Sequence, residues 1–101
     1  MICSATVETV AQHKGEKVVF CGTPSHVSTA KKADGPVFLD FGVDPQESTF
    51  KVVIFSDVAG PDRDALVKRF KGKALRLRGV VTEYKGAPEV ILKSMDDIEV
   101  D

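Results

Sequence analysis

Stretches in which hydrophobic and polar residues alternate, or in which β-branched residues run together, recur along the chain and predict five β-strands. Ser4 can cap a short N-terminal helix that Gly15 ends. A second helix is expected within 62–71, because Leu66 and Phe70 lie four residues apart. The predicted order is a helix, three strands, a helix and two strands. The predicted strands cover residues 17–23, 37–41, 49–55, 74–84 and 89–93.

Proline and glycine mark the points at which these strands bend or reverse. Pro24 confines the stretch after the first strand to a sheet edge or a bend. Gly79 predicts a bulge or a tight bend within the long fourth strand. Lys85-Gly86 predicts a hairpin turn between the fourth and fifth strands.

The composition is typical of a single soluble domain in which sheet dominates. Hydrophobic residues make up 43% of the chain and charged residues 29%, which excludes disordered, collagen-like, coiled-coil and disulfide-scaffold proteins. Val and Ile together number 19 against five Leu, and β-branched residues favour strands. No apolar run is long enough to span a membrane. We therefore expect one domain over 1–101, with residues 1–4 and 96–101 as tails.

Charge is spread unevenly along the chain. The formal charge is −1 overall, but it is −3 over 1–62, +6 over 63–88 and −4 over 89–101. The net charge of the chain is thus nearly zero although it contains a basic segment and an acidic C-terminal tail. The basic segment is a candidate surface for nucleic-acid phosphates.

Three stretches resemble a known family: residues 38–42 (FLDFG), residues 50–55 (FKVVIF), and 72–90, through Gly72-Lys73, Gly79-Val80-Val81 and YKGAPEV. They are similar to OB-fold domains of the anticodon-binding (tRNA-anti-like) type, and to small prokaryotic relatives that stand alone, sit in lipoproteins or are fused to nucleases. The resemblance covers roughly residues 5–100. It implies a five-stranded OB-fold barrel, all-β with minor α (β-β-β-α-β-β), here with a short N-terminal helix.

The resemblance also implies nucleic-acid binding on the surface of the second and third strands, flanked by two loops. Phe38 matches the second-strand aromatic that stacks on a base, and Lys51 matches the polar reader on the third strand. Tyr84-Lys85-Gly86 matches the loop between the fourth and fifth strands.

Strand alternation supports these positions independently. If Leu39 and Val52 point inward, then Phe38, Lys51 and Phe55 point outward. Outward aromatics stack on bases and outward cations follow phosphates, so we expect a non-catalytic module that binds single-stranded DNA or RNA. The candidate binding residues are Phe38, Lys51, Phe55, Arg76, Arg78, Tyr84, Lys85, Lys31 and Lys32.

A second hypothesis assigns the same face to protein interaction or self-association. Its interface would consist of the outward apolar residues Phe38, Val53, Phe55 and Ile91. The sequence leaves the compartment open between two alternatives: a soluble cytoplasmic protein, or an exported one from which an N-terminal leader was removed.

No enzymatic activity, cofactor or metal is expected. Ser25 and His26 are adjacent on an extended segment and face opposite ways, which does not suit a nucleophile and its base. Cys21 and His26 could bind zinc only if Cys3 and His13 converged on them. The two cysteines permit one disulfide, but the apolar surroundings of Cys21 favour a free buried thiol.

Overall fold

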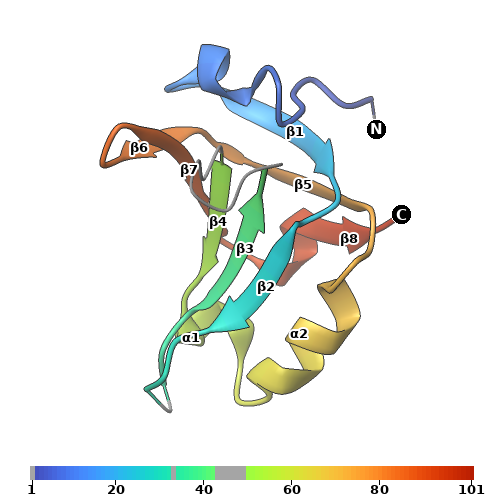
Figure 1. Cartoon of the computed structure of the whole chain (residues 1–101), viewed down its shortest axis with the longest axis vertical. Coiled ribbons are helices and arrows are strands. Elements are labelled where there is room, and N and C mark those ends of the chain that lie inside the picture. Colours follow the sequence, from blue (N-terminus) through green and yellow to red (C-terminus); the bar gives the residue numbers. More distant parts are fainter. Residues whose placement is uncertain (1, 33, 43–49) are drawn as a thin grey trace.

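Two β-sheets that share one core form the body of the protein (Figure 1). The structure is a computed structural model and describes residues 2–32, 34–42 and 50–101. The three-stranded sheet has the order β1-β5-β8, with these strands at Lys17–Gly22, Leu75–Val80 and Ile98–Val100. The five-stranded sheet has the order β2-β3-β4-β7-β6, and its strands lie at His26–Thr29, Val37–Phe41, Phe50–Ile54, Ala87–Ile91 and Thr82–Tyr84. The helical elements of the described residues are η1 (Val10–His13), α1 (Ser56–Ala59), α2 (Arg63–Phe70) and η2 (Met95–Asp97).

The polypeptide passes from the three-stranded sheet to the five-stranded sheet at two interruptions of strand structure. The segment around Pro24 separates β1 from β2, as predicted, and Val81 separates β5 from β6. Strands β4 and β7 pair in parallel, whereas the other neighbouring strands pair antiparallel. The pairing of the described residues gives two sheets and does not join them into one closed barrel. The all-β class with minor α is thus confirmed. The fourth predicted strand is divided into β5 and β6, and β2 forms after Pro24, where no strand was predicted.

Aromatic side chains from both sheets form the centre of the core. The ring centroid of Phe20 on β1 lies 4.9 Å from that of Phe41 on β3 and 4.5 Å from that of Phe50 on β4. Leu39 and Val52, the inward residues beside them, are also fully buried, as the alternation predicts. Each such side chain contributes about 1.5–3 kcal/mol on burial, so this cluster holds the two sheets together.

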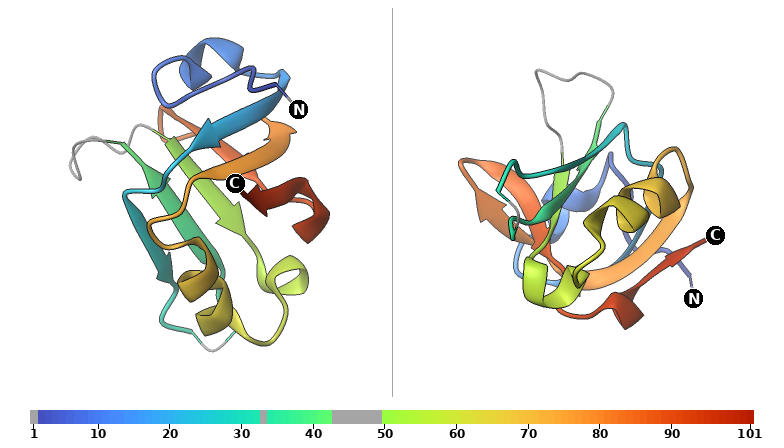
Figure 2. Two further views of the ribbon diagram at one scale, coloured as in Figure 1. Left: turned by 90° about the vertical axis from the view of Figure 1, so that its right-hand side faces the viewer. Right: turned by 90° about the horizontal axis from the view of Figure 1, so that it is seen from below.

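Helix α2 lies at one end of the sheets and packs against β2 and β3 (Figure 2). Asp62 caps it, because its carboxylate accepts a hydrogen bond from the Ala65 amide at 3.1 Å. Leu66 and Phe70, which the spacing places on one face, are both buried. The second predicted helix is confirmed.

The N-terminal segment differs from the prediction. Only a short 3₁₀ helix, η1, forms, and Ser4 does not cap it: the Ser4 hydroxyl accepts a hydrogen bond from the Val19 amide at 2.8 Å. The segment runs beside β1 because the Ser4 amide also donates to the Val19 carbonyl. This pairing brings Cys3 to Cys21, and the two form a disulfide. The prediction of a free buried thiol at Cys21 is therefore wrong. The positions of the two cysteines in the sequence do not reveal that the N-terminal segment lies beside β1.

Gly79 does not form the predicted bulge. It pairs in unbroken register with Val18, and the strand is interrupted only at Val81. A Cβ atom at position 79 would lie 2.5 Å from Cγ1 of Val90, so glycine is needed here for the close approach of β5 to β7. The hairpin predicted at Lys85-Gly86 is present, with Tyr84 paired to Ala87.

The acidic C-terminal segment is part of the folded structure and not the expected tail. Residues 95–97 form η2, and β8 pairs with β5. Ile98 is only 4% exposed and anchors this strand in the core. The neighbouring carboxylates meet the arginines of β5: Asp97 pairs with Arg78, and Asp101 with Arg76.

Candidate nucleic-acid interface

The outer face of the five-stranded sheet, the face turned away from the core, carries the predicted binding residues Phe38, Lys51 and Tyr84. Strand register places two rows of outward side chains across it. One row consists of the apolar residues Phe38, Val53 and Ile91 on β3, β4 and β7, with Ser28 on β2 at its end, and is called the apolar row. The polar row consists of His26, Asp40, Lys51, Glu89 and Thr82 on β2, β3, β4, β7 and β6.

Phe38 lies on the outer face, as its alternation with buried neighbours predicts. It is half-buried and is not among the core residues. It lies beside Val53, which is only 6% exposed because Phe38 and Ile91 flank it. The Lys51 ammonium lies 5.4 Å from the centroid of the Phe38 ring, which is cation–π range. The Phe38 ring therefore has Val53 and Lys51 as neighbours and remains partly exposed to solvent.

Lys51 is shared between an aromatic ring and a carboxylate. Its ammonium lies 3.8 Å from a carboxylate oxygen of Asp40, its neighbour in register on β3. Glu89 is the register neighbour on β7. Two carboxylates thus flank the cation, and Asp40 competes with any phosphate for it.

The hairpin between β6 and β7 supplies the second aromatic–cation pair. Lys85 and Gly86 have φ angles of 51° and 83°, as a two-residue turn between strands requires. Tyr84 is 57% exposed, and the Lys85 ammonium lies 5.4 Å from the centroid of its ring. This pair and Lys51 border one hollow of about 340 Å³, lined by Lys51, Tyr84, Lys85, Ala87, Pro88 and Glu89. Ala87, Pro88 and Glu89 are not among the residues predicted from the sequence, although alternation along β7 turns Ala87 and Glu89 outward.

Phe55, Lys31 and Lys32 lie toward the opposite end of the same sheet. Phe55 directly follows β4 and is 45% exposed. Lys31 and Lys32 are exposed in the segment between β2 and β3, next to the end of β4 in register. Phe55 follows Lys51 by four positions, which in an extended strand is about 13 Å. The candidate residues are thus spread along the sheet from the hairpin to this end.

Arg76 and Arg78 belong to the three-stranded sheet, and acidic partners hold both. An Nη atom of Arg76 lies 3.1 Å from the Asp101 carboxylate, and one of Arg78 lies 3.4 Å from the Asp97 carboxylate. Arg78 also donates to the Asp96 carbonyl at 3.1 Å. The structure does not bring these arginines into the rows of the outer face.

Comparison with known proteins adds no assignment. No protein-family model matches this chain, and no curated protein sequence matches it. None of the helices in the described part of the chain is long and apolar enough to span a bilayer. Among the same residues, no three His, Cys, Asp or Glu side chains are grouped as metal ligands would be.

Proposed function

We propose that this protein is an OB-fold module that binds single-stranded nucleic acid on the outer face of its five-stranded sheet. One observation carries the proposal: two aromatic–cation pairs, Phe38 with Lys51 and Tyr84 with Lys85, lie on one sheet, and Lys51, Tyr84 and Lys85 border a shared hollow. Aromatic faces stack on bases with about 1–3 kcal/mol each, and neighbouring cations follow the phosphates.

The strand connections support the OB-fold part of the proposal. If β1 with β2 counts as one bent strand, and β5 with β6 as another, the chain has five strands with α2 before the fourth. The first strand then pairs with the second and the fourth, and the third pairs in parallel with the fifth. These pairings agree with those expected of a five-stranded, partly open Greek-key barrel, and this agreement supports the proposal.

The charges of this face favour a single strand over a duplex. Duplex binders neutralise many phosphates, whereas Lys51 and Lys85 are the cations that border the hollow, and Glu89 lies there too. Exposed aromatic rings need bases that are not already stacked in a helix, and a single strand presents them. Stacking therefore supplies most of the expected affinity.

A fluorescence anisotropy titration tests the proposal. The wild-type protein and the Phe38→Leu and Tyr84→Leu variants are titrated against a labelled single strand of about 16 nucleotides. We expect saturable binding at about 50 mM salt, weakened several-fold by each variant. Val100→Ala is the control, because this apolar residue is also exposed but lies on β8.

Absence of binding by the wild-type protein at low salt would refute the proposal. In that case, concentration-dependent dimerisation that Phe38→Glu abolishes would assign the apolar row to protein interaction or self-association.

A further inference from the structure

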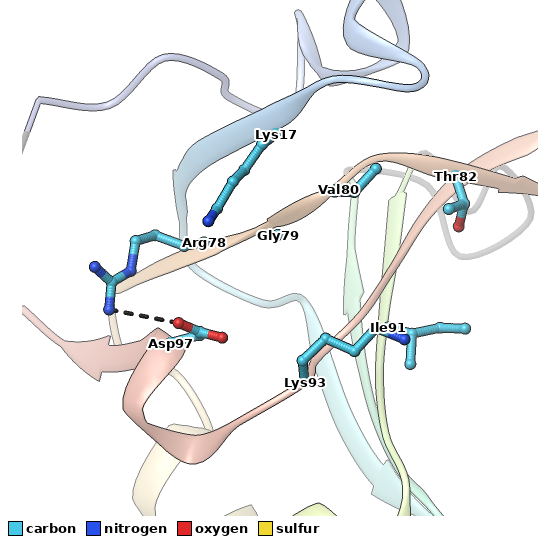
Figure 3. Close-up of a pocket in the computed structure, with 8 residues that line it drawn as sticks. All are labelled: Lys17, Arg78, Gly79, Val80, Thr82, Ile91, Lys93 and Asp97. Atoms are coloured by element: carbon cyan, nitrogen blue, oxygen red, sulfur yellow. Dashed lines mark ion pairs between the residues drawn. The ribbon is translucent and has the colours of Figure 1, made fainter.

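A second pocket, of about 280 Å³, lies where β5 of one sheet passes β7 of the other (Figure 3). Lys17 and Arg78 line it on the side of β1 and β5, and Ile91 and Lys93 on the side of β7. It is separate from the hollow beside the hairpin, with which it shares no lining residue. The full lining is Lys17, Arg78, Gly79, Val80, Thr82, Ile91, Lys93 and Asp97.

Positive charge dominates this pocket. Three cations and one carboxylate leave it with a formal charge of +2. Asp97 is engaged by Arg78 at 3.4 Å. Within the described ranges, no carboxylate lies within ion-pair distance of Lys17 or Lys93. A bound anion would give both lysines an ion-pair partner.

The walls of the pocket are fixed by the fold. Arg78 is held by the Asp96 carbonyl and the Asp97 carboxylate, so its guanidinium has a set orientation. Gly79 contributes bare backbone to the pocket lining, and a Cβ atom at this position would collide with Val90. Val80, which is 47% exposed, and Ile91 add apolar surface. The volume is slightly below that of pockets for drug-sized ligands, so it suits a compact group.

We propose that this pocket binds a phosphate monoester. A monoester carries about −1.5 to −2 charges at pH 7, which matches the formal charge of the pocket, whereas a diester carries only one. Figure 3 shows Lys17 and Lys93 on different sides of the pocket, and both side chains are exposed, so their ammonium groups turn toward the phosphate oxygens on binding. The carbon atoms next to the ester oxygen lie against Val80 and Ile91. The pocket shares Thr82 and Ile91 with the rows of the outer face but no residue with the hollow beside the hairpin, and the proposal stands whether or not a nucleic acid binds at that hollow.

Backbone amide chemical shifts, followed by NMR at pH 7.5 during titration with phenyl phosphate, test this proposal. We expect saturable shifts centred on Gly79 and Val80, and much smaller ones with dimethyl phosphate, a diester. Lys17→Gln/Lys93→Gln should weaken binding at least ten-fold. Both lysines are exposed, so the fold is expected to tolerate the change. The matched control is Lys68→Gln/Lys71→Gln, which removes two exposed charges at the end of α2.

Shifts that do not saturate, or that the Lys17→Gln/Lys93→Gln variant leaves unchanged, would overturn the proposal. Binding should also weaken as the pH falls below about 6, where the monoester loses its second charge. Equal binding of the diester would contradict the assignment to a monoester.

Two oligonucleotides of one sequence, with and without a 5′-phosphate, distinguish the sources of the monoester. If the 5′-phosphate raises the oligonucleotide affinity of the wild type but not that of the Lys17→Gln/Lys93→Gln variant, the pocket binds a nucleic-acid terminus. Phenyl phosphate binding without that gain assigns it to a free phosphorylated molecule. Phe38→Leu should weaken oligonucleotide binding and leave phenyl phosphate binding unchanged, so the two proposals can fail separately.

Discussion

Truncation of Phe38 separates a binding residue from a core residue. Phe38→Ala removes a half-buried ring from the outer face, where it covers Val53 and contacts Lys51. Loss of about half of the burial free energy of a phenylalanine, together with its cross-strand pair, destabilises the fold by about 1–2 kcal/mol. The loss of a base stack costs about 1–3 kcal/mol of binding, or roughly a 5- to 150-fold weaker affinity.

Two comparison variants make this prediction sharp. Phe41→Ala truncates a buried ring on the same strand and should cost about 3–5 kcal/mol of folding stability. Phe38→Leu keeps an apolar cover over Val53 without an aromatic face, so it should melt close to the wild type and still lose the stack.

Thermal denaturation followed by circular dichroism, together with anisotropy titrations, measures both effects. Each kcal/mol corresponds to about 4–8 °C in a domain of this size. Phe38→Ala should therefore melt about 4–16 °C below the wild type, clearly above Phe41→Ala. A melting temperature as low as that of Phe41→Ala with oligonucleotide affinity intact would refute the placement of Phe38 in the interface.

Three further predictions concern charge and packing. Asp40→Asn should raise oligonucleotide affinity several-fold in anisotropy titrations, because it frees the Lys51 ammonium from a carboxylate at 3.8 Å. Lys51→Ala and Lys85→Ala should each reduce the slope of log affinity against log salt by about 0.7, the value for one phosphate contact on a single strand. Gly79→Ala should lower the free energy of unfolding by about 1–3 kcal/mol through its collision with Val90, measured by urea denaturation.

Each of these variants has a control. Asp57→Asn, the control for Asp40→Asn, removes an exposed carboxylate on α1 and should leave the oligonucleotide affinity unchanged. Lys73→Ala, the control for the two lysine variants, removes a charge after α2 and should leave the salt slope unchanged. The control for Gly79→Ala is Val90→Ala, which removes the side-chain atoms that collide with the methyl group introduced at position 79. Val90→Ala should therefore lower the free energy of unfolding less in the Gly79→Ala variant than in the wild type. Additive losses in that double variant would contradict the packing explanation, and unchanged slopes would exclude phosphate contacts by Lys51 and Lys85.

Local signals in the sequence were sufficient for much of the fold. Alternation predicted the buried and outward faces of β3, and the spacing of Leu66 and Phe70 predicted α2. The turn at Lys85-Gly86 was predictable because few residue pairs suit a two-residue hairpin. These features depend on residues close together in the chain, and they also located Phe38, Lys51 and Tyr84.

Features that depend on distant parts of the chain were not predictable in the same way. Strand β8 lies in an acidic run and is held by Ile98 and by pairs with Arg76 and Arg78. The sequence alone presents those arginines as free cations. The disulfide likewise depends on the N-terminal segment lying beside β1, which the positions of Cys3 and Cys21 do not reveal.

The central claim is that the outer face of the five-stranded sheet binds single-stranded nucleic acid. Mapping of backbone amide shifts on addition of an oligonucleotide of about 16 nucleotides at low salt tests it most directly. The account predicts saturable shifts concentrated at Phe38, Lys51, Val53 and the turn from Tyr84 to Gly86, with little change in α2. Absence of shifts with oligonucleotide in excess, or shifts confined to α2 and β8, would contradict it.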